Sequence, residues 1–114
     1  MLGEVLGAAT TCEEYLSEYI HPVNGASLEQ IVKLQMFLRN FQNENVLITG
    51  SYDAATIAAV NRFQVANWEE VLLPWVPYGL PTAQTPTDYV YKTTKRWINM
   101  TVCPELALPM PQLP

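Results

Sequence analysis

The sequence is poor in basic side chains and contains no long hydrophobic run. Six Lys and Arg residues against eleven Asp and Glu residues give the 114-residue chain a formal net charge of −5. Nucleic acids and anionic membrane surfaces are bound by clustered Lys and Arg, and no such cluster occurs. No apolar stretch approaches the roughly 20 residues that span a bilayer. We therefore expect a soluble chain with no nucleic-acid partner and no membrane span, whose export signal was removed or never present.

Histidine is almost absent, which leaves few routes to catalysis. His21 is the single histidine and has no cysteine near it in sequence, so a loop position at a helix end is favoured over a metal ligand or a general base. The acidic pairs at 13–14 and 69–70 would point to different faces of a helix, which is typical of solvated surface. The five glycines are scattered and form no phosphate-binding loop. We expect no enzyme activity, no cofactor and no metal site.

Only two cysteines are present, Cys12 and Cys103, one near each end of the predicted domain. No second pair offers a metal-ligand spacing, which favours a disulfide. Such a bond would close a loop of 91 residues (103 − 12). On the loop-entropy model it would stabilise the fold by roughly 4–5 kcal/mol and would place the protein in an oxidising compartment. The alternative is a pair of buried, reduced thiols.

The clearest helix signal starts at Ser27. With Gln30 three residues later, Ser27 forms a capping-box pattern. Apolar residues then recur at three- and four-residue steps, which places them on one helical face: Ile31, Leu34, Leu38 and Phe41. The pattern predicts an amphipathic helix that ends near Asn43.

A second helix follows the turn residues Asn43, Asn45 and Gly50. Asp53 can accept hydrogen bonds from the free amides that open this helix. The predicted buried stripe is Thr56, Ala59, Val60 and Phe63. Two helices are therefore expected to face each other across a short connection.

The stretch from Ser27 to Gln64 resembles the helical peptidoglycan-binding-like domain. The resemblance rests on Val32-Lys33-Leu34-Gln35, Leu38, Thr49-Gly50-Ser51-Tyr52-Asp53, Thr56, Ala59-Val60 and Phe63-Gln64, and covers about a third of the chain. It implies an all-α, non-catalytic three-helix module of the kind found in secreted or cell-surface bacterial proteins, often beside cell-wall enzymes. The implied partner is peptidoglycan or another surface glycan.

An internal repeat relates the second helix to the end of the chain. The pairs that lie 38 residues apart are Thr49 and Thr87, Thr56 and Thr94, Val60 and Ile98, and Asn61 and Asn99. Trp97 and Thr101 complete the corresponding stripe of a third helix. This spacing predicts two similar turn-plus-helix units packed on the first helix. Since Asp88 stands where the first unit has Gly50, the second turn need not copy the first in detail.

Three further segments surround the helices. Residues 13–20 carry an apolar spacing that predicts a short helix ended by Pro22. Residues 68–87 contain four prolines, which predicts an irregular loop with one helical turn near 69–72, wrapped on the helices through its apolar side chains. We divide the chain into an extended arm at 1–11, the domain at 12–103 and a proline-rich tail at 104–114.

Two functions from different classes follow. Six aromatic residues lie in or beside the predicted turns, where they suit recognition of sugars or peptides: Tyr52, Trp68, Trp75, Tyr78, Tyr89 and Tyr91. Packing in the core is the alternative, especially for the two tryptophans. The first hypothesis is therefore an extracellular or cell-surface module that binds cell-wall glycan or peptide. The second is a self-assembling subunit of a surface filament or layer. Its apolar ends would dock on neighbouring copies rather than on their own domain, through Leu2, Val5, Leu6, Leu106, Leu108 and Met110.

Overall fold

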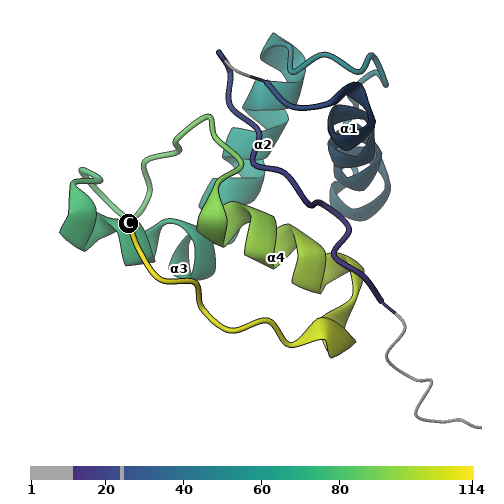
Figure 1. Cartoon of the computed structure of the whole chain (residues 1–114). Helices are drawn as coiled ribbons and strands as arrows, with labels where there is room; N and C mark the ends of the chain where they lie inside the picture. Colours follow the sequence, from purple (N-terminus) through teal and green to yellow (C-terminus); the bar gives the residue numbers. More distant parts are fainter. Residues whose placement is uncertain (1–11, 24) are drawn as a thin grey trace, which may run out of the picture.

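The computed structural model describes residues 12–23 and 25–114, and its regular structure is helical (Figure 1). The helices are α1 (Leu28–Gln42), α2 (Ala54–Ala66), α3 (Trp68–Val71) and α4 (Lys92–Val102), with the 3₁₀ helices η2 (Leu73–Tyr78) and η3 (Pro104–Leu106). The described ranges contain no named strand, only the isolated bridges Ile20–Val90 and His21–Gly25. The expected all-α class is thereby confirmed. None of the helices in these ranges combines the length and apolar character that crossing a bilayer requires.

The predicted caps begin α1 and α2. The Ser27 hydroxyl oxygen accepts from the Gln30 amide at 3.4 Å, and an Asp53 carboxylate oxygen accepts from the Thr56 amide at 3.0 Å. Each satisfies an amide that has no partner inside its helix. The predicted stripe of α2 is buried in full. The local sequence therefore sets where both helices start and which face of α2 turns inward.

The predicted stripe of α1 needs one correction. Ile31, Leu34 and Leu38 are buried as expected, but Phe41 is 49% exposed. The buried aromatic residue is Phe37, and its ring stacks against that of Phe41 at 5.4 Å between centroids. Phe41 lies in the last turn of α1, where it covers Phe37 from the solvent side instead of joining the core.

The core lies where α1, α2 and α4 meet. Its largest fully buried apolar side chains come from four separate segments: Leu16, Ile20, Leu34, Phe37, Leu38, Leu72 and Ile98. Phe37 meets Phe63 of α2 edge to face at 5.4 Å between ring centroids. Cys12 and Cys103 form the predicted disulfide across 91 residues, which ties the N-terminal segment to the end of α4.

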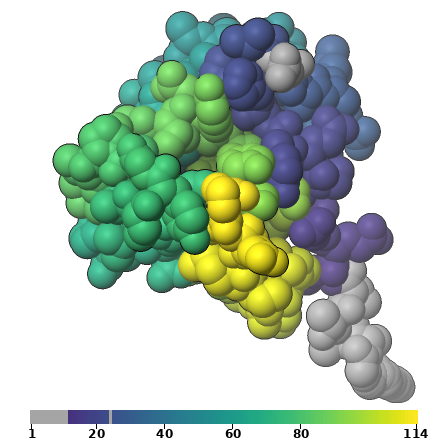
Figure 2. Space-filling model, turned by 60° about the vertical axis from the view of Figure 1, so that its left-hand side comes forward, coloured from purple at the N-terminus to yellow at the C-terminus, as the bar shows by residue number. Residues whose placement is uncertain are grey.

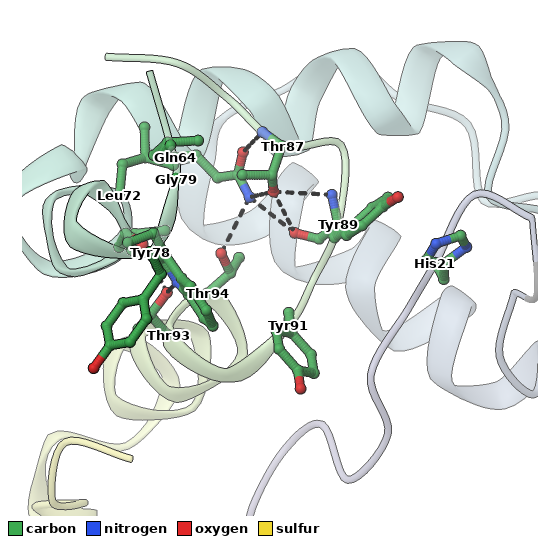
Figure 3. Close-up of a pocket in the computed structure, with 13 residues that line it drawn as sticks. His21, Gln64, Leu72, Tyr78, Gly79, Thr87, Tyr89, Tyr91, Thr93 and Thr94 are labelled. Carbon is green, nitrogen blue, oxygen red and sulfur yellow. Dashed lines mark hydrogen bonds between the residues drawn. The ribbon is translucent and has the colours of Figure 1, made fainter. Parts of the chain in front are cut away.

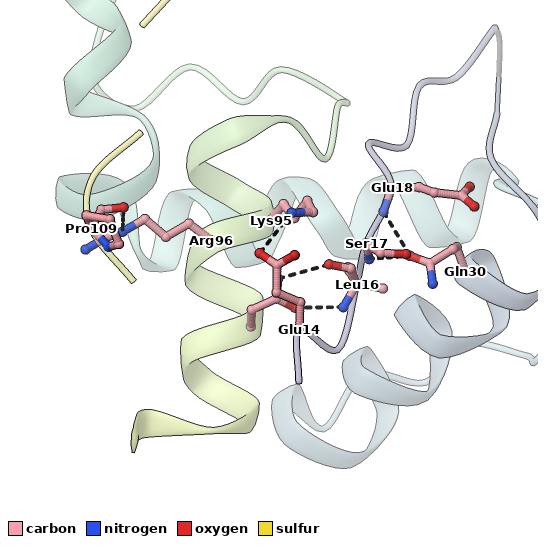
Figure 4. A network of polar contacts seen from close by, with 9 residues as sticks. Glu14, Leu16, Ser17, Glu18, Gln30, Lys95, Arg96 and Pro109 are labelled. Carbon is pink, nitrogen blue, oxygen red and sulfur yellow. Dashed lines mark hydrogen bonds and ion pairs between the residues drawn. The ribbon is translucent and has the colours of Figure 1, made fainter. Parts of the chain in front are cut away.

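The helix predicted at 13–20 is wrong. This segment runs without helical hydrogen bonds past α1 and α4, because side chains of those helices take its backbone groups (Figure 4). Asn99 Oδ1 accepts from the Leu16 amide at 2.7 Å, and Asn99 Nδ2 donates to the Leu16 carbonyl at 3.0 Å. Gln30 Oε1 accepts from the amides of Ser17 and Glu18 at 2.8 and 3.1 Å. These partners replace the bonds that a helix would have made within itself.

The proline-rich tail lies on its own domain. Figure 1 shows it passing along α4 toward α3. Arg96 Nε donates to the carbonyls of Leu108 and Pro109, both at 3.1 Å, and Lys92 Nζ donates to the carbonyls of Gln112 and Pro114, both at 2.9 Å. Two cationic side chains thus hold backbone groups that have no partner in an extended chain.

The residues proposed for assembly fall in two groups. Leu106 and Leu108 in the tail are half-buried, whereas Met110 is 47% exposed. Leu2, Val5 and Leu6 of the predicted arm lie outside the described residues. The tail therefore leaves part of its apolar surface available to a partner.

Candidate functional site

The first turn-plus-helix unit is organised by a buried amide, Gln35. Gln35 Nε2 donates to Thr49 Oγ1, Ser51 O and Thr56 Oγ1, each at 3.0 Å. Gln35 Oε1 accepts from the amides of Thr49 and Gly50 at 2.9 and 3.0 Å. Because this side chain is fully buried, these bonds lock the turn onto α1 and α2. We call this set of residues the Gln35 cluster.

A second buried amide, Gln64, repeats the arrangement. Gln64 Nε2 donates to Thr87 Oγ1 at 2.9 Å, Tyr89 O at 2.8 Å and Thr94 Oγ1 at 3.1 Å (Figure 3). Gln64 Oε1 accepts from the Thr87 amide at 2.9 Å. The three partners of this Gln64 cluster stand 38 residues after the partners of Gln35, which explains the repeat seen in the sequence.

The second turn copies the backbone of the first more closely than expected. Asp88 has φ 68° and Gly50 has φ 78°, so both occupy the left-handed region. Glycine enters this region without steric cost, and aspartate tolerates it when its polar groups are bonded. Asn61 supplies those bonds: its Oδ1 accepts from the Asp88 amide at 3.0 Å and its Nδ2 donates to Asp88 Oδ1 at 2.7 Å.

An insertion distinguishes the two units. Thr87 follows Gln64 by 23 residues, whereas Thr49 follows Gln35 by 14. The longer connection contains α3 and η2, whose residues line one pocket together with residues of the 87–91 turn. Between them lies a pocket of about 500 Å³ that includes the Gln64 cluster in its wall (Figure 3). Its volume falls within the roughly 300–1,000 Å³ typical of small-ligand sites.

Aromatic rings form much of the pocket wall, namely His21, Trp75, Tyr78, Tyr89 and Tyr91. The Trp75 ring lies 5.7 Å from Tyr91 and 6.2 Å from Tyr78, between centroids. Across the pocket, His21 lies 4.2 Å from Tyr89. Trp75 is held in place because its Nε1–H donates to Thr93 Oγ1 at 2.8 Å, and that hydroxyl donates to the Val71 carbonyl at 2.7 Å. The rings therefore have a defined arrangement.

The pocket lining is uncharged. Among the residues that the structure describes, no Asp, Glu, Lys or Arg side chain contributes to it. The polar atoms of Gln64 and Thr93 are already used within the fold. The hydroxyls of Tyr78, Tyr89 and Tyr91, by contrast, form no hydrogen bond within the described part of the chain. The pocket thus offers ring faces and free hydroxyls, a combination suited to a neutral ligand.

Four of the six proposed ligand-binding residues meet in this pocket: Trp75, Tyr78, Tyr89 and Tyr91. The other two do not line it. Trp68 packs against the hydrophobic core, and the Tyr52 hydroxyl donates to the Asp88 carbonyl between the two units. Burial, with a smaller contribution from the Asp88 charge, raises the pKa of Tyr52 above its usual range.

Sequence reasoning misses two contributors to the site. The sequence predicts a loop position for His21, and its Nδ1 does accept from the Val23 amide at 3.0 Å, but its ring also lines the pocket. Gln64 stands out in the sequence only as part of the family pattern. The 38-residue spacing of its threonine partners contains the signal that could have identified it.

Within the described ranges, one group of residues brings potential metal-ligand atoms close together: Cys12, Cys103 and Glu105. Both sulfur atoms belong to the disulfide. Metal binding by cysteine requires the thiolate, so this group lacks the donors that it would need.

Comparison of the chain with protein-family models, with curated proteins and with solved structures found no match.

Proposed function

We propose that this chain is a non-catalytic, extracellular or cell-surface module that resembles peptidoglycan-binding domains and binds cell-wall glycan or peptide in the aromatic pocket. The observation that carries the proposal is the insertion of α3 and η2 in the second unit. It adds a pocket with ring faces at the place where the first unit has a plain turn.

The chemistry of the lining favours the glycan over the peptide. Sugar rings present apolar C–H faces to aromatic rings and take hydrogen bonds from hydroxyl groups. Trp75, Tyr78 and Tyr91 supply such faces, and the tyrosines supply unbonded hydroxyls. Cell-wall peptides carry carboxylates, which the uncharged lining could not neutralise. A neutral sugar is therefore the preferred ligand.

The disulfide supports the proposed compartment. A bond between Cys12 and Cys103 persists in oxidising surroundings such as the cell exterior. The described lining residues include one histidine and no carboxylate, whereas general acid–base catalysis needs a positioned acid and a positioned base, so this lining supports a binding role over catalysis.

Co-sedimentation with purified peptidoglycan tests the proposal. The wild-type chain, with its disulfide intact, should sediment with the glycan. Tyr78→Ala should weaken binding by roughly 2- to 12-fold, which corresponds to one aromatic contact worth about 0.5–1.5 kcal/mol. Tyr78 suits this test because it is 54% exposed and lies outside the core, so its removal should leave the fold intact.

Phe41→Ala is the matched control. Phe41 is 49% exposed, belongs to α1 and does not line the pocket. It should bind peptidoglycan as the wild type does. Failure of the wild-type chain to sediment with peptidoglycan, or equal losses in the two variants, would refute the proposed function.

A further inference from the structure

The C-terminal segment 107–114 has the composition of a ligand for an aromatic site. Its sequence is ALPMPQLP, with three prolines and no charged side chain. The segment has no regular hydrogen-bonded structure. Extended proline-rich chains leave their carbonyls unpaired, and aromatic grooves recognise them by packing on the proline rings and donating to those carbonyls.

The tail of the same copy stops at the edge of the pocket. Lys92, which holds the carbonyls of Gln112 and Pro114, lies over the Tyr91 ring at 5.7 Å. Tyr91 lines the pocket, whereas no tail residue does. Figure 2 shows the tail, in yellow, passing beside α3 and η2 on the surface. The tail therefore reaches the rim and leaves the pocket open.

The distribution of charge favours the C-terminal segment as the part of a second copy that binds the pocket. Each chain carries a formal net charge of −5, so two copies repel each other at long range. The segment after Glu105 has no charged side chain, and no Asp, Glu, Lys or Arg is among the described residues that line the pocket. Its proline, leucine and methionine side chains can therefore enter the pocket without the desolvation cost that charged side chains would meet.

Release of the segment 107–114 from its own domain breaks hydrogen bonds to its backbone and uncovers three half-buried side chains. Four hydrogen bonds from the side chains of Lys92 and Arg96 hold its backbone. Met110 and Pro114 are already exposed. A segment held in this way can open locally while the core remains folded.

We infer that the aromatic pocket binds the proline-rich segment 107–114 of a second copy of this chain, and that copies thereby associate head to tail. The inference rests on the proposed role of the pocket as a binding site and adds a protein ligand to it. The prolines of the incoming tail pack on the rings of Trp75, Tyr78 and Tyr91, and the free tyrosine hydroxyls donate to its carbonyls. Pocket and tail are different surfaces, so the contact is heterologous and extends into rings or chains of copies.

Sedimentation velocity of the full chain, over a range of concentrations, tests this inference. The wild type should form species larger than a monomer as concentration rises. Tyr78→Ala should lower the association constant by roughly 2- to 12-fold, the value of one aromatic contact. Lys92→Ala should raise it, because this substitution frees the end of the tail from its own copy without changing the pocket lining.

A synthetic ALPMPQLP peptide provides an independent readout. Added in excess, it should occupy the pocket and return the chain to monomers, and it should shift the NMR signal of the Trp75 indole N–H. A peptide with alanine at its three proline positions should do neither. A chain that remains monomeric in both wild-type and Lys92→Ala forms would overturn the inference. Association that is unaffected by Tyr78→Ala and by the peptide would do the same.

The two proposals fail separately. If peptidoglycan binds in a Tyr78-dependent manner while the chain stays monomeric, the pocket is a glycan site and the tail inference is wrong. If copies associate through the pocket but do not sediment with peptidoglycan, the tail inference stands as an assembly contact and the glycan function is wrong. If neither occurs, both proposals are wrong.

Discussion

Gln64→Leu should destabilise the domain far more than its small change in side-chain volume suggests. The substitution removes the amide of the Gln64 cluster and leaves its partners in place. These are the Thr94 hydroxyl, the Tyr89 carbonyl and the Thr87 amide. The Tyr89 carbonyl still accepts from Thr87 Oγ1 at 3.4 Å, whereas the Thr94 hydroxyl and the Thr87 amide have to find another hydrogen-bond partner or remain unpaired.

The magnitude follows from how accessible each abandoned group is. Thr94 is 3% exposed, so its hydroxyl remains desolvated, which costs about 1–3 kcal/mol. The groups of Tyr89 and Thr87 lie beside the pocket, where water can replace the lost amide, so each adds a smaller amount. The expected total is a loss of about 2–4 kcal/mol in the free energy of unfolding, a large fraction of the roughly 5–15 kcal/mol of a typical domain.

Denaturant titration of the wild type and the variant measures this loss. The comparison requires that the free energy of unfolding depends on denaturant concentration with the same slope in both proteins. Gln64→Glu serves as the matched isostere. Burial among these acceptors should raise the pKa of the new carboxyl group in the folded state. The folded form then binds a proton that the unfolded form has released, so the stability of this variant should fall as pH rises above about 4. A Gln64→Leu variant within about 0.5 kcal/mol of wild type would show that the cluster contributes nothing beyond packing.

Three other predictions concern the rest of the fold. Asp53→Ala should cost about 0.5–2 kcal/mol by loss of the α2 cap. The hydrogen bonds from Thr56 lower the pKa of Asp53 in the folded state. The stabilisation by the ionised carboxylate is therefore complete above about pH 4 and is lost as pH falls through the lower pKa of the folded state. Denaturant titrations at several pH values should show this dependence in the wild type and not in Asp53→Asn. The double substitution Cys12→Ser and Cys103→Ser should cost up to roughly 4–5 kcal/mol in chemical unfolding, and a reductant should then have no further effect. Gly50→Ala should lower the melting temperature more than Gly25→Ala, because both positions have positive φ but only the first would bring the new carbon 2.9 Å from a side-chain atom.

Each of these three has a result that would contradict it. Equal acid sensitivity of wild type and Asp53→Asn would remove Asp53 as the source of the pH dependence. Unchanged stability of the cysteine variant would argue against the loop-closure account. Equal melting temperatures for the two glycine variants would show that the neighbouring Leu28 side chain moves away at no cost.

Local signals were reliable where neighbouring residues decided the outcome. The caps at Ser27 and Asp53 and the buried stripe of α2 were predicted because a side chain three residues away, or an apolar residue one turn away, is sufficient to produce them. The same rules failed at 13–20, where an apolar spacing compatible with a helix belongs to an extended segment. Its partners lie as far as 83 residues away in sequence, beyond the reach of a periodicity argument.

The candidate site was predicted in part for a similar reason. Aromatic residues beside turns are a compositional signal, and four of the six meet in the pocket. Composition could not say that Tyr52 joins the two units or that Trp68 packs on the core. Nor could it place His21 opposite the 87–91 turn, since that depends on the bridge between Ile20 and Val90.

The sequence alone determined the three main helices and the two-unit repeat, and it favoured a bond between the two cysteines over reduced thiols. Capping and periodicity depend on residues close together in the chain, and two cysteines allow only one pairing. Tertiary structure decided the extended path of the N-terminal segment, the position of the tail along α4 and the existence of the pocket. Each of these depends on hydrogen bonds and packing between segments far apart in the chain, such as Asn99 with Leu16, Lys92 with Gln112 and Gln64 with Thr87.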